Sequence, residues 1–174
     1  QIKQIENLVN EFSDFARMPK PLIKENNLYE VINENIILLS KIDANIKIKL
    51  INHLHNNFLV NFDYEQFNRL FFNLIKNSIE SIQEKAEKDN KIDKNIDIEI
   101  RERRDYIIIN ILDTGIGFKD KKTKDLIKPY FTTKQKGTGL GLSIVDKIIS
   151  DHNGSINFLN QNNGAKIQII IPNK

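Results

Sequence analysis

Cysteine is absent from this chain of 174 residues. Without thiols the chain forms no disulfide bond and no thiolate metal site, and it has no cysteine nucleophile, so these three classes of chemistry are excluded. The absence is compatible with a reducing compartment, which it permits without demonstrating.

A strong net charge and long apolar runs are also missing. The formal net charge is +3, and the lysines are dispersed rather than interleaved with aromatic residues, so we predict no nucleic-acid partner. No apolar run approaches the roughly 20 residues that span a bilayer, and no signal peptide is recognised, so we expect no membrane contact from this segment. With 40% hydrophobic and 28% charged residues, the chain has the composition of one globular domain with an appendage.

Glycine is scarce, with 7 residues in the chain, and most of them fall in two short motifs. The first is Asp113-Thr-Gly-Ile-Gly117, directly after a strand-like run, and the second is Gly137-Thr-Gly-Leu-Gly-Leu142, directly before a helix-like run. A carboxylate on a glycine turn accepts a hydrogen bond from an exocyclic amine, and a glycine turn at a helix start offers backbone N–H groups to phosphates. Adenine at one motif and phosphates at the other describe an ATP site.

Two better-known glycine motifs are excluded. A P-loop requires a glycine, four residues and then Gly-Lys-Ser/Thr, and the sequence contains no such string. The dinucleotide fingerprint requires a glycine or alanine where this chain has Leu142 or Ile144. Each glycine cluster alone also fits a tight turn without a ligand, but their order and a third element upstream favour a nucleotide site.

The third element is an amphipathic helix predicted over residues 63–82, where apolar residues recur at helical spacing. Asn73 and Asn77 stand one turn apart on the same side of it. Asparagine is a mediocre helix former, so a pair in mid-helix requires an explanation. Either both belong to a solvated polar face, or their side-chain oxygens are ligands of Mg²⁺, which bridges substrate phosphates.

The predicted elements indicate one α/β domain after residue 27. Helices are expected at 28–40, 63–82 and 140–151, and strands at 46–50, 58–62, 96–100, 106–112, 155–159 and 165–171. Residues 118–136 are expected to form a long irregular, lysine-rich lid. Helices on one face of a mixed sheet give a two-layer sandwich.

Four motifs in this order resemble the N, G1, F and G2 boxes of sensor histidine kinases. They are Asn73-Leu-Ile-Lys-Asn77, the Asp113 motif, Pro129-Tyr-Phe-Thr-Thr-Lys134 and the Gly137 motif. Sensor kinases share an ATPase superfamily with DNA gyrase B, the ninety-kilodalton heat-shock chaperone and the MutL mismatch-repair protein. The resemblance extends over residues 1–172, and the opening residues 10–21 are similar to the nitrogen-regulation type of sensor kinase.

This resemblance implies three segments. Residues 1–18 would be the remnant of the second helix of a dimerisation and phosphoacceptor hairpin, because their near-heptad apolar stripe requires a partner helix. Residues 19–27 would be a linker, since the Pro-x-Pro exit stops the helix. Residues 28–174 would be the catalytic ATP-binding domain, with the histidine-kinase ATPase fold.

The resemblance also implies the roles of the site residues. Asp113 would accept the adenine amine and select ATP over GTP, while Gly115 and Gly117 let the chain approach the base. Asn77 and Asn73 would hold Mg²⁺. The other implied nucleotide-binding residues lie in the lid and the second glycine motif: Phe131, Thr132, Thr133, Lys134, Gly137, Thr138, Gly139, Leu140, Gly141 and Leu142. Among the lid lysines that would surround the triphosphate, Lys134 is the best candidate for direct contact, and Lys128 is another member of this group.

Two positions separate this chain from related subclasses. Superfamily members that hydrolyse ATP carry a glutamate one turn before the metal-binding asparagine, and here that position is Asn73, which cannot act as a base. Many sensor kinases place a basic residue three positions after the second asparagine, where this chain has Glu80. That phosphate contact is therefore in doubt.

No histidine of the chain has the context of a phosphoacceptor. His53 and His55 are expected in a polar loop between strands, and His152 is expected to cap a helix end, so structural or surface roles are predicted for all three. No catalytic residue is assigned, and the phosphoacceptor histidine is expected upstream of Gln1. The chain alone should therefore be inactive in autophosphorylation.

The sequence thus predicts the catalytic domain of a two-component sensor histidine kinase, with ATP and Mg²⁺ as cofactors. It would pass the γ-phosphoryl group to a histidine of its own dimerisation domain, for onward transfer to a response regulator. The full-length protein would be a homodimer, membrane-anchored or not, with this domain in the cytoplasm. An anti-sigma-type serine kinase is the alternative, disfavoured by the first helix and its Pro-x-Pro exit, and a gyrase-like ATPase is disfavoured by Asn73.

Overall fold

The computed structural model describes residues 9, 12–13, 16–54, 59–89, 91–118, 123–130 and 137–173. Along these ranges the chain forms β1 (Lys24–Asn27), α2 (Leu28–Leu39), β2 (Lys47–His53), β3 (Leu59–Phe62), α3 (Tyr64–Ala86), β4 (Asn95–Arg103), β5 (Tyr106–Asp113), α4 (Thr123–Leu126), α5 (Gly141–Asp151), β6 (Ser155–Gln161) and β7 (Gly164–Pro172). Every helix and strand predicted after residue 27 is present, with shifted ends.

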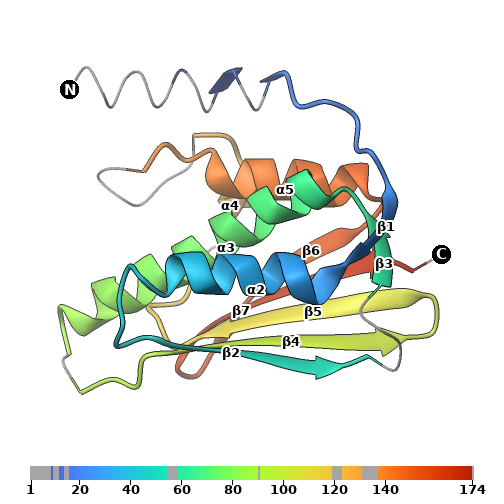
Figure 1. The fold of residues 1–174 in the computed structure, drawn as a ribbon. Coiled ribbons are helices and arrows are strands. Elements are labelled where there is room, and N and C mark those ends of the chain that lie inside the picture. The colour runs from blue at the N-terminus through green and yellow to red at the C-terminus, as the bar shows by residue number, and fades with distance from the viewer. Residues whose placement is uncertain are drawn as a thin grey trace.

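A five-stranded sheet forms one layer of the domain, in the order β2-β4-β5-β7-β6. Strands β2 and β4 run parallel, and the other neighbouring pairs are antiparallel, so the sheet is mixed. Helices α2, α3 and α5 lie together over one face of this sheet (Figure 1). The predicted two-layer α/β sandwich is therefore confirmed.

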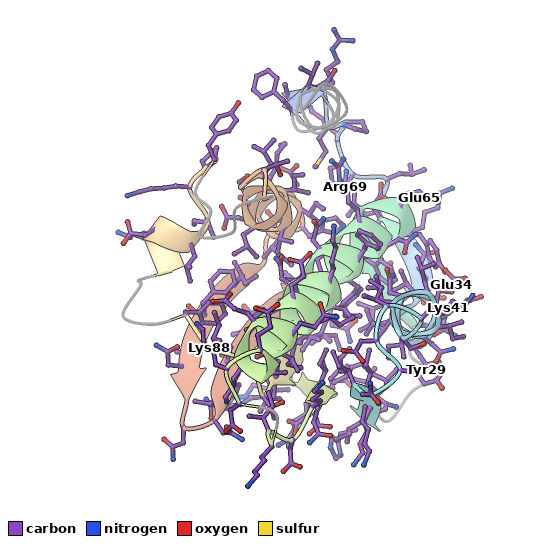
Figure 2. All side chains as sticks on the ribbon, turned by 90° about the vertical axis from the view of Figure 1, so that its left-hand side faces the viewer. Tyr29, Glu34, Lys41, Glu65, Arg69 and Lys88 are labelled. Carbon is purple, nitrogen blue, oxygen red and sulfur yellow. The ribbon has the colours of Figure 1, made fainter. Side chains whose placement is uncertain are left out.

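The core lies between the two layers, and side chains fill that space (Figure 2). Alternate residues of β4 and β5 point to the helices, as strand geometry requires. The helical layer contributes the apolar stripe of α3. The fully buried residues that meet here include Ile96, Ile98, Ile100, Ile107, Ile109, Ile111, Phe67, Leu70, Phe71, Leu74, Ile75 and Ile82. This packing fixes α3 across the sheet and so positions the polar side chains of α3, Asn73 and Asn77 among them.

Strand β1 was not expected, because its residues were predicted to belong to a linker at 19–27. It pairs antiparallel with β3, from Lys24 opposite Phe62 to Asn27 opposite Leu59. The Asn26 side chain also donates to the carbonyl oxygen of Phe62 (2.8 Å). The four residues of β1 are all polar, so backbone pairing and not hydrophobic alternation forms the strand, and the sequence pattern cannot reveal it.

The N-terminal segment is helical at the described residues 9, 12, 13 and 16, and the helix has ended by Met18. Val9 and Phe12, both on the predicted apolar stripe, are exposed, while Met18 packs against the core. The pairing of this helix in a dimerisation hairpin stays a prediction. Nowhere in the described ranges is there a helix with the length and apolar character needed to cross a membrane.

Candidate nucleotide-binding site

Asp113 is the last residue of β5, a central strand, and its side chain is almost fully buried. One carboxylate oxygen, Oδ1, accepts from the backbone N–H of Gly115 (2.9 Å), and Oδ2 accepts from the hydroxyl of Ser78 on α3 (3.1 Å). Burial raises the pKa of Asp113, whereas these hydrogen bonds to its charged form act to lower it. The result is a rigid carboxylate with a fixed orientation at the end of the strand.

The glycines after Asp113 are required by close contacts. A Cβ atom on Gly115 would collide with the Ser81 side chain and lie 2.8 Å from the Ser81 backbone carbon. Gly117 has a φ of +72°, and a Cβ there would lie 2.9 Å from Oδ1 of Asn160. The loop is therefore pressed against α3 on one side and β6 on the other, as expected for glycines that permit close approach.

Side chains of α3 and β6 also bind the backbone of this loop. The N–H of Ile116 donates to Oγ of Ser81 (3.1 Å), and the N–H of Phe118 donates to Oδ1 of Asn160 (2.8 Å). Both donors would otherwise lack a partner within regular secondary structure. The loop after β5 is thus held by side chains from two elements.

Asn73 and Asn77 lie half-buried on α3, one turn apart. The Asn73 amide group donates to the carbonyl oxygen of Arg69 (2.8 Å), and its own oxygen would lie 3.0 Å from a Cβ atom on Gly141. The first asparagine therefore meets the start of α5, and the structure brings together two motifs separated in the sequence. Lys76 is exposed between them, with its ammonium 5.8 Å from the Phe72 ring centre.

The second glycine motif leads directly into α5. Gly139 has a φ of +72°, and Leu140, the N-cap residue, is fully buried and provides no side-chain hydrogen bond to the helix start. Thr138 accepts a long bond from the N–H of Leu140 (3.4 Å), and Leu142 packs partly against the core. A helix start without a side-chain cap presents N–H groups that suit an anion.

The lid is described only in part. Phe131, Thr132, Thr133 and Lys134 lie outside the described residues, so their predicted contacts with nucleotide stay predictions. Within the expected irregular stretch the structure places the short helix α4, which is anchored by the buried Leu126. Lys128 pairs with Asp125 (2.7 Å), so the structure shows this lysine engaged with a carboxylate.

Three site residues were missed by the sequence analysis: Ser78, Ser81 and Lys85. They follow one face of α3 at spacings of three and four residues, and each binds the segment from Asp113 to Ile116. Their spacing is visible in the sequence and was the available signal. Small polar residues at helical spacing are common on solvated faces, however, and the partners of these three lie 29 or 35 residues away in the sequence.

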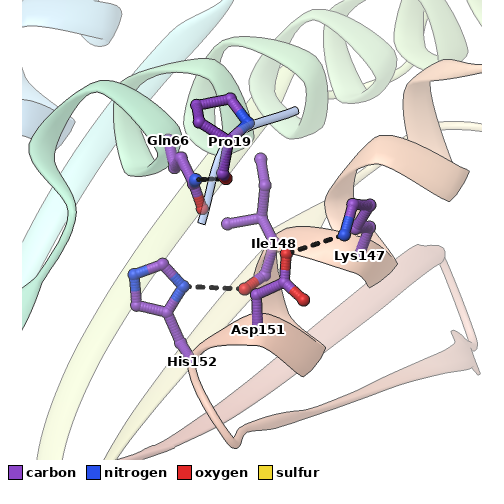
Figure 3. A network of polar contacts seen from close by, with 6 residues as sticks. All are labelled: Pro19, Gln66, Lys147, Ile148, Asp151 and His152. Atoms are coloured by element: carbon purple, nitrogen blue, oxygen red, sulfur yellow. Dashed lines mark hydrogen bonds and ion pairs between the residues drawn. The ribbon is translucent and has the colours of Figure 1, made fainter. Parts of the chain in front are cut away.

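His152 is the C-cap of α5 and is buried, as predicted for a structural histidine. Its Nε2 accepts from the backbone N–H of Asp63 (3.0 Å), so Nδ1 carries the proton and donates to the carbonyl oxygen of Ile148 (2.7 Å; Figure 3). Burial lowers the pKa of His152. The prediction for His53 was wrong in its location, because His53 ends β2 rather than lying in a loop, and His55 lies outside the described residues.

The segment 19–22 is tied to the same corner of the domain. The amide of Gln66 donates to the carbonyl oxygen of Pro19 (3.0 Å; Figure 3), and the N–H of Leu22 donates to Oδ2 of Asp63 (2.6 Å). The start of α3 therefore contacts both the end of α5 and the chain that enters the domain.

Comparison with known proteins agrees with this geometry. Residues 62–174 match the model of a family described as histidine kinase-, DNA gyrase B- and HSP90-like ATPases. The chain is 31% identical, over 173 residues, to the nitrogen regulation protein NtrY of Azorhizobium caulinodans, a match that covers 98% of this chain and 22% of that protein. The chain thus spans about a fifth of that relative's length.

Solved structures show the same fold. The catalytic domain of the histidine kinase ThkA, in a nucleotide-free form, is 29% identical with a TM-score of 0.73, covering 87% of this chain and 95% of that one. A structure of ThkA in complex with the response regulator protein TrrA is 25% identical with a TM-score of 0.77, covering 99% of this chain and 48% of that one.

Proposed function

The chain belongs to the family of histidine kinase-, DNA gyrase B- and HSP90-like ATPases, and from this premise we propose that it is the catalytic domain of a two-component sensor histidine kinase. Its nucleotide would lie between α3, the loop after β5 and the start of α5. The observation that carries the proposal is the buried Asp113 carboxylate, oriented by Gly115 and Ser78. This residue offers a fixed hydrogen-bond acceptor at the bottom of the site.

The adenine end of the site selects by hydrogen-bond polarity. An ionised carboxylate only accepts, and adenine presents an amine donor at the position where guanine presents a carbonyl oxygen. A guanine oxygen facing Asp113 would place two acceptors against each other with no donor between them, at a cost of about 1–3 kcal/mol. We therefore assign Asp113 to recognition of ATP over GTP, with Gly115 and Gly117 allowing the base to approach.

The phosphate end combines the start of α5 with the asparagines of α3. The backbone N–H groups around Gly139 and Gly141 suit phosphate oxygens, because no side chain caps the helix. The Asn73 amide donates to Arg69, which leaves its oxygen for another partner, and amide oxygens fit the preference of Mg²⁺ for hard ligands. We assign Asn77 and Asn73 as the residues that would hold Mg²⁺, which when bound would offset the negative charge of the phosphates.

Asn73 bears on whether the γ-phosphoryl group passes to water or to a histidine. Asn73 occupies the position from which a glutamate would activate water, and an amide cannot accept a proton there, so the γ-phosphoryl group is preserved for a histidine. We propose that this histidine belongs to the protein's own dimerisation domain and that a response regulator is the next acceptor. The complex of ThkA with TrrA supports that partner class. On this proposal the domain works in the cytoplasm as part of a homodimer.

Titration calorimetry with ATP and GTP tests the nucleotide assignment. We expect ATP to bind more tightly than GTP, and Asp113→Asn to weaken ATP binding by about 1–3 kcal/mol, because the amide turns a donor toward the adenine amine. Asp105→Asn is the matched control, since Asp105 is exposed at the β4–β5 turn. Identical titration curves for ATP and GTP on the unmodified chain would overturn the assignment.

A further inference from the structure

Lys85 lies half-buried near the end of α3 and directs its ammonium group toward two different loops. Its Nζ lies 3.0 Å from the carbonyl oxygen of Thr114, and 2.8 Å from Oδ1 and 3.5 Å from the carbonyl oxygen of Asn163. All three acceptors are uncharged. An ammonium group usually remains hydrated, so its use to join two backbone segments calls for an explanation.

The two loops that Lys85 joins both lie next to Asp113. Thr114 follows Asp113 in the chain, and Asn163 lies in the turn between β6 and β7. The next residue, Gly164, begins β7 and packs so tightly on the Asp113 backbone that a Cβ atom there would collide with the Asp113 carbonyl oxygen. A Cβ on Gly117 would in turn lie 3.1 Å from the Gly164 carbonyl oxygen. The β6–β7 turn and the start of β7 thus pack against the loop after Asp113. Lys85 links α3 to this loop through Thr114 and to the turn through Asn163.

The charge of Lys85 acts on Asp113 as well. Burial raises the pKa of the Asp113 carboxyl group, and the positive charge of Lys85 is one of the influences that lower it. The ionised form has only acceptors and is the stronger hydrogen-bond acceptor for the adenine amine. The charge of Lys85 thus acts in the same direction as its contacts with the loop after Asp113.

We propose that Lys85 is a positioning residue for base selectivity: by joining α3 to Thr114 and Asn163, it holds the Asp113 carboxylate where an adenine amine meets it. This inference rests on the proposed nucleotide-binding function and goes further, because it assigns selectivity to a residue that lies outside all four motifs. Ser81, one turn before Lys85, supports the same loop through the N–H of Ile116.

A purely structural role makes a different prediction. Lys85 is a cation in the last turn of α3, where it also interacts favourably with the helix dipole. If that were its whole contribution, replacing it would lower stability and weaken all nucleotides alike. Selectivity between two nucleotides whose bases differ at the amine, and at the ring nitrogen N1 beside it, separates the two roles. Inosine triphosphate (ITP) is the suitable probe, because its base carries a carbonyl oxygen in place of the adenine amine.

The experiment measures ATP and ITP affinities, and the melting temperature, for the 174-residue chain and three variants. In Lys85→Met we expect ATP affinity to fall about tenfold and ITP affinity less than about threefold, because only ATP depends on the oriented carboxylate. Lys85→Arg keeps a donor for both loops and should retain most of the selectivity. Lys88→Met is the matched control, because Lys88 is exposed just beyond the end of α3 (Figure 2) and pairs with Glu84 (3.6 Å).

Each outcome separates the possibilities. A lower ratio of ATP to ITP affinity in Lys85→Met, with the ratio unchanged in Lys88→Met, supports the proposal. An unchanged ratio in Lys85→Met, even with a lower melting temperature, overturns it and leaves the adenine assignment intact. Equal ATP and ITP affinities in the unmodified chain would instead overturn the assignment of Asp113, and the role of Lys85 with it.

Discussion

Burial shifts the pKa values of Asp113 and His152 in opposite directions, because it disfavours the charged form of each side chain. It raises the pKa of Asp113 and lowers that of His152. For Asp113, hydrogen bonds to both carboxylate oxygens act against the rise in pKa, because they favour the ionised form. The His152 ring is used in its neutral form, because only an unprotonated Nε2 can accept from the N–H of Asp63. Each residue thus has a charge state that its hydrogen bonds specify.

For His152 this predicts a pH-dependent stability. The pKa of the folded state lies below the ordinary value of 6.5, so the stabilisation is fully present above 6.5 and is lost as the pH falls through the folded-state pKa. We expect the free energy of unfolding in urea, measured from about pH 8 to about pH 5, to decrease over this range. His152→Gln should remove that component of the slope, whereas His53→Gln, at an exposed strand end, should keep it. The same slope in all three proteins would contradict the role given to His152.

At the level of elements, α3 contacts different parts of the molecule along its whole length. Its middle carries Asn73 and Asn77, and its last turns carry the side chains that hold the loop after β5. Its first turn contacts the entering chain through Asp63 and Gln66. A displacement of α3 would therefore move Asn73, Asn77 and the loop after β5 together.

The N-cap of α3 offers a test of this arrangement. Asp63 accepts from the N–H of Gln66 (3.0 Å) and from the N–H of Leu22 (2.6 Å), so it caps the helix and holds the entering segment at once. We expect Asp63→Ala to lower the free energy of unfolding by about 1–3 kcal/mol and to accelerate hydrogen exchange at the Leu22 amide. Asn27→Ala is the control, because Asn27 caps α2 with one bond, to the N–H of Glu30 (3.2 Å).

The Asp63 variant should be the more destabilised of the two, since it loses an additional long-range bond. If Asn27→Ala proved equally destabilising, or if exchange at Leu22 stayed slow in Asp63→Ala, the link between the entering segment and α3 would have no energetic weight. Chemical denaturation and exchange mass spectrometry provide the two measurements.

At the level of the whole molecule, the described residues include the proposed nucleotide site and two histidines, and each of these histidines has a structural position of its own. His152 is buried in a hydrogen-bonded helix cap, and His53 lies at the end of a strand. We therefore expect the 174-residue chain, incubated with labelled ATP, to show no acid-labile label and only slow phosphate release. Joining it to an upstream helix that carries a histidine, in a form that dimerises, should produce phosphohistidine.

The control for this experiment is the same fusion with that histidine replaced by glutamine, which should remain unlabelled. Phosphohistidine mapped to His53, His55 or His152 in the isolated chain would overturn the assignment of a separate phosphoacceptor. Rapid phosphate release that disappeared in Asn73→Ala would point to an ATPase instead.

The sequence by itself determined the class of fold and the order of the site motifs. Alternating isoleucines mark β4, and the apolar stripe of α3 has helical spacing, because each pattern is set by which side of one element faces the core. A nearly continuous apolar run marks β5. The glycine motifs were also readable, since a turn or a close backbone approach restricts residue type locally. These features depend on neighbours within a few residues, so one sequence suffices to predict them.

Only the tertiary structure decided which polar residues serve the site. Ser78, Ser81 and Lys85 gain their roles from partners that lie 29 or 35 residues away in the sequence. Strand β1 forms because its backbone pairs with β3, although all four of its side chains are polar. His152 likewise depends on Asp63, which lies 89 positions earlier. Such contacts leave no periodic trace, because a single polar side chain suits solvent and a buried partner equally well until the fold supplies one of them.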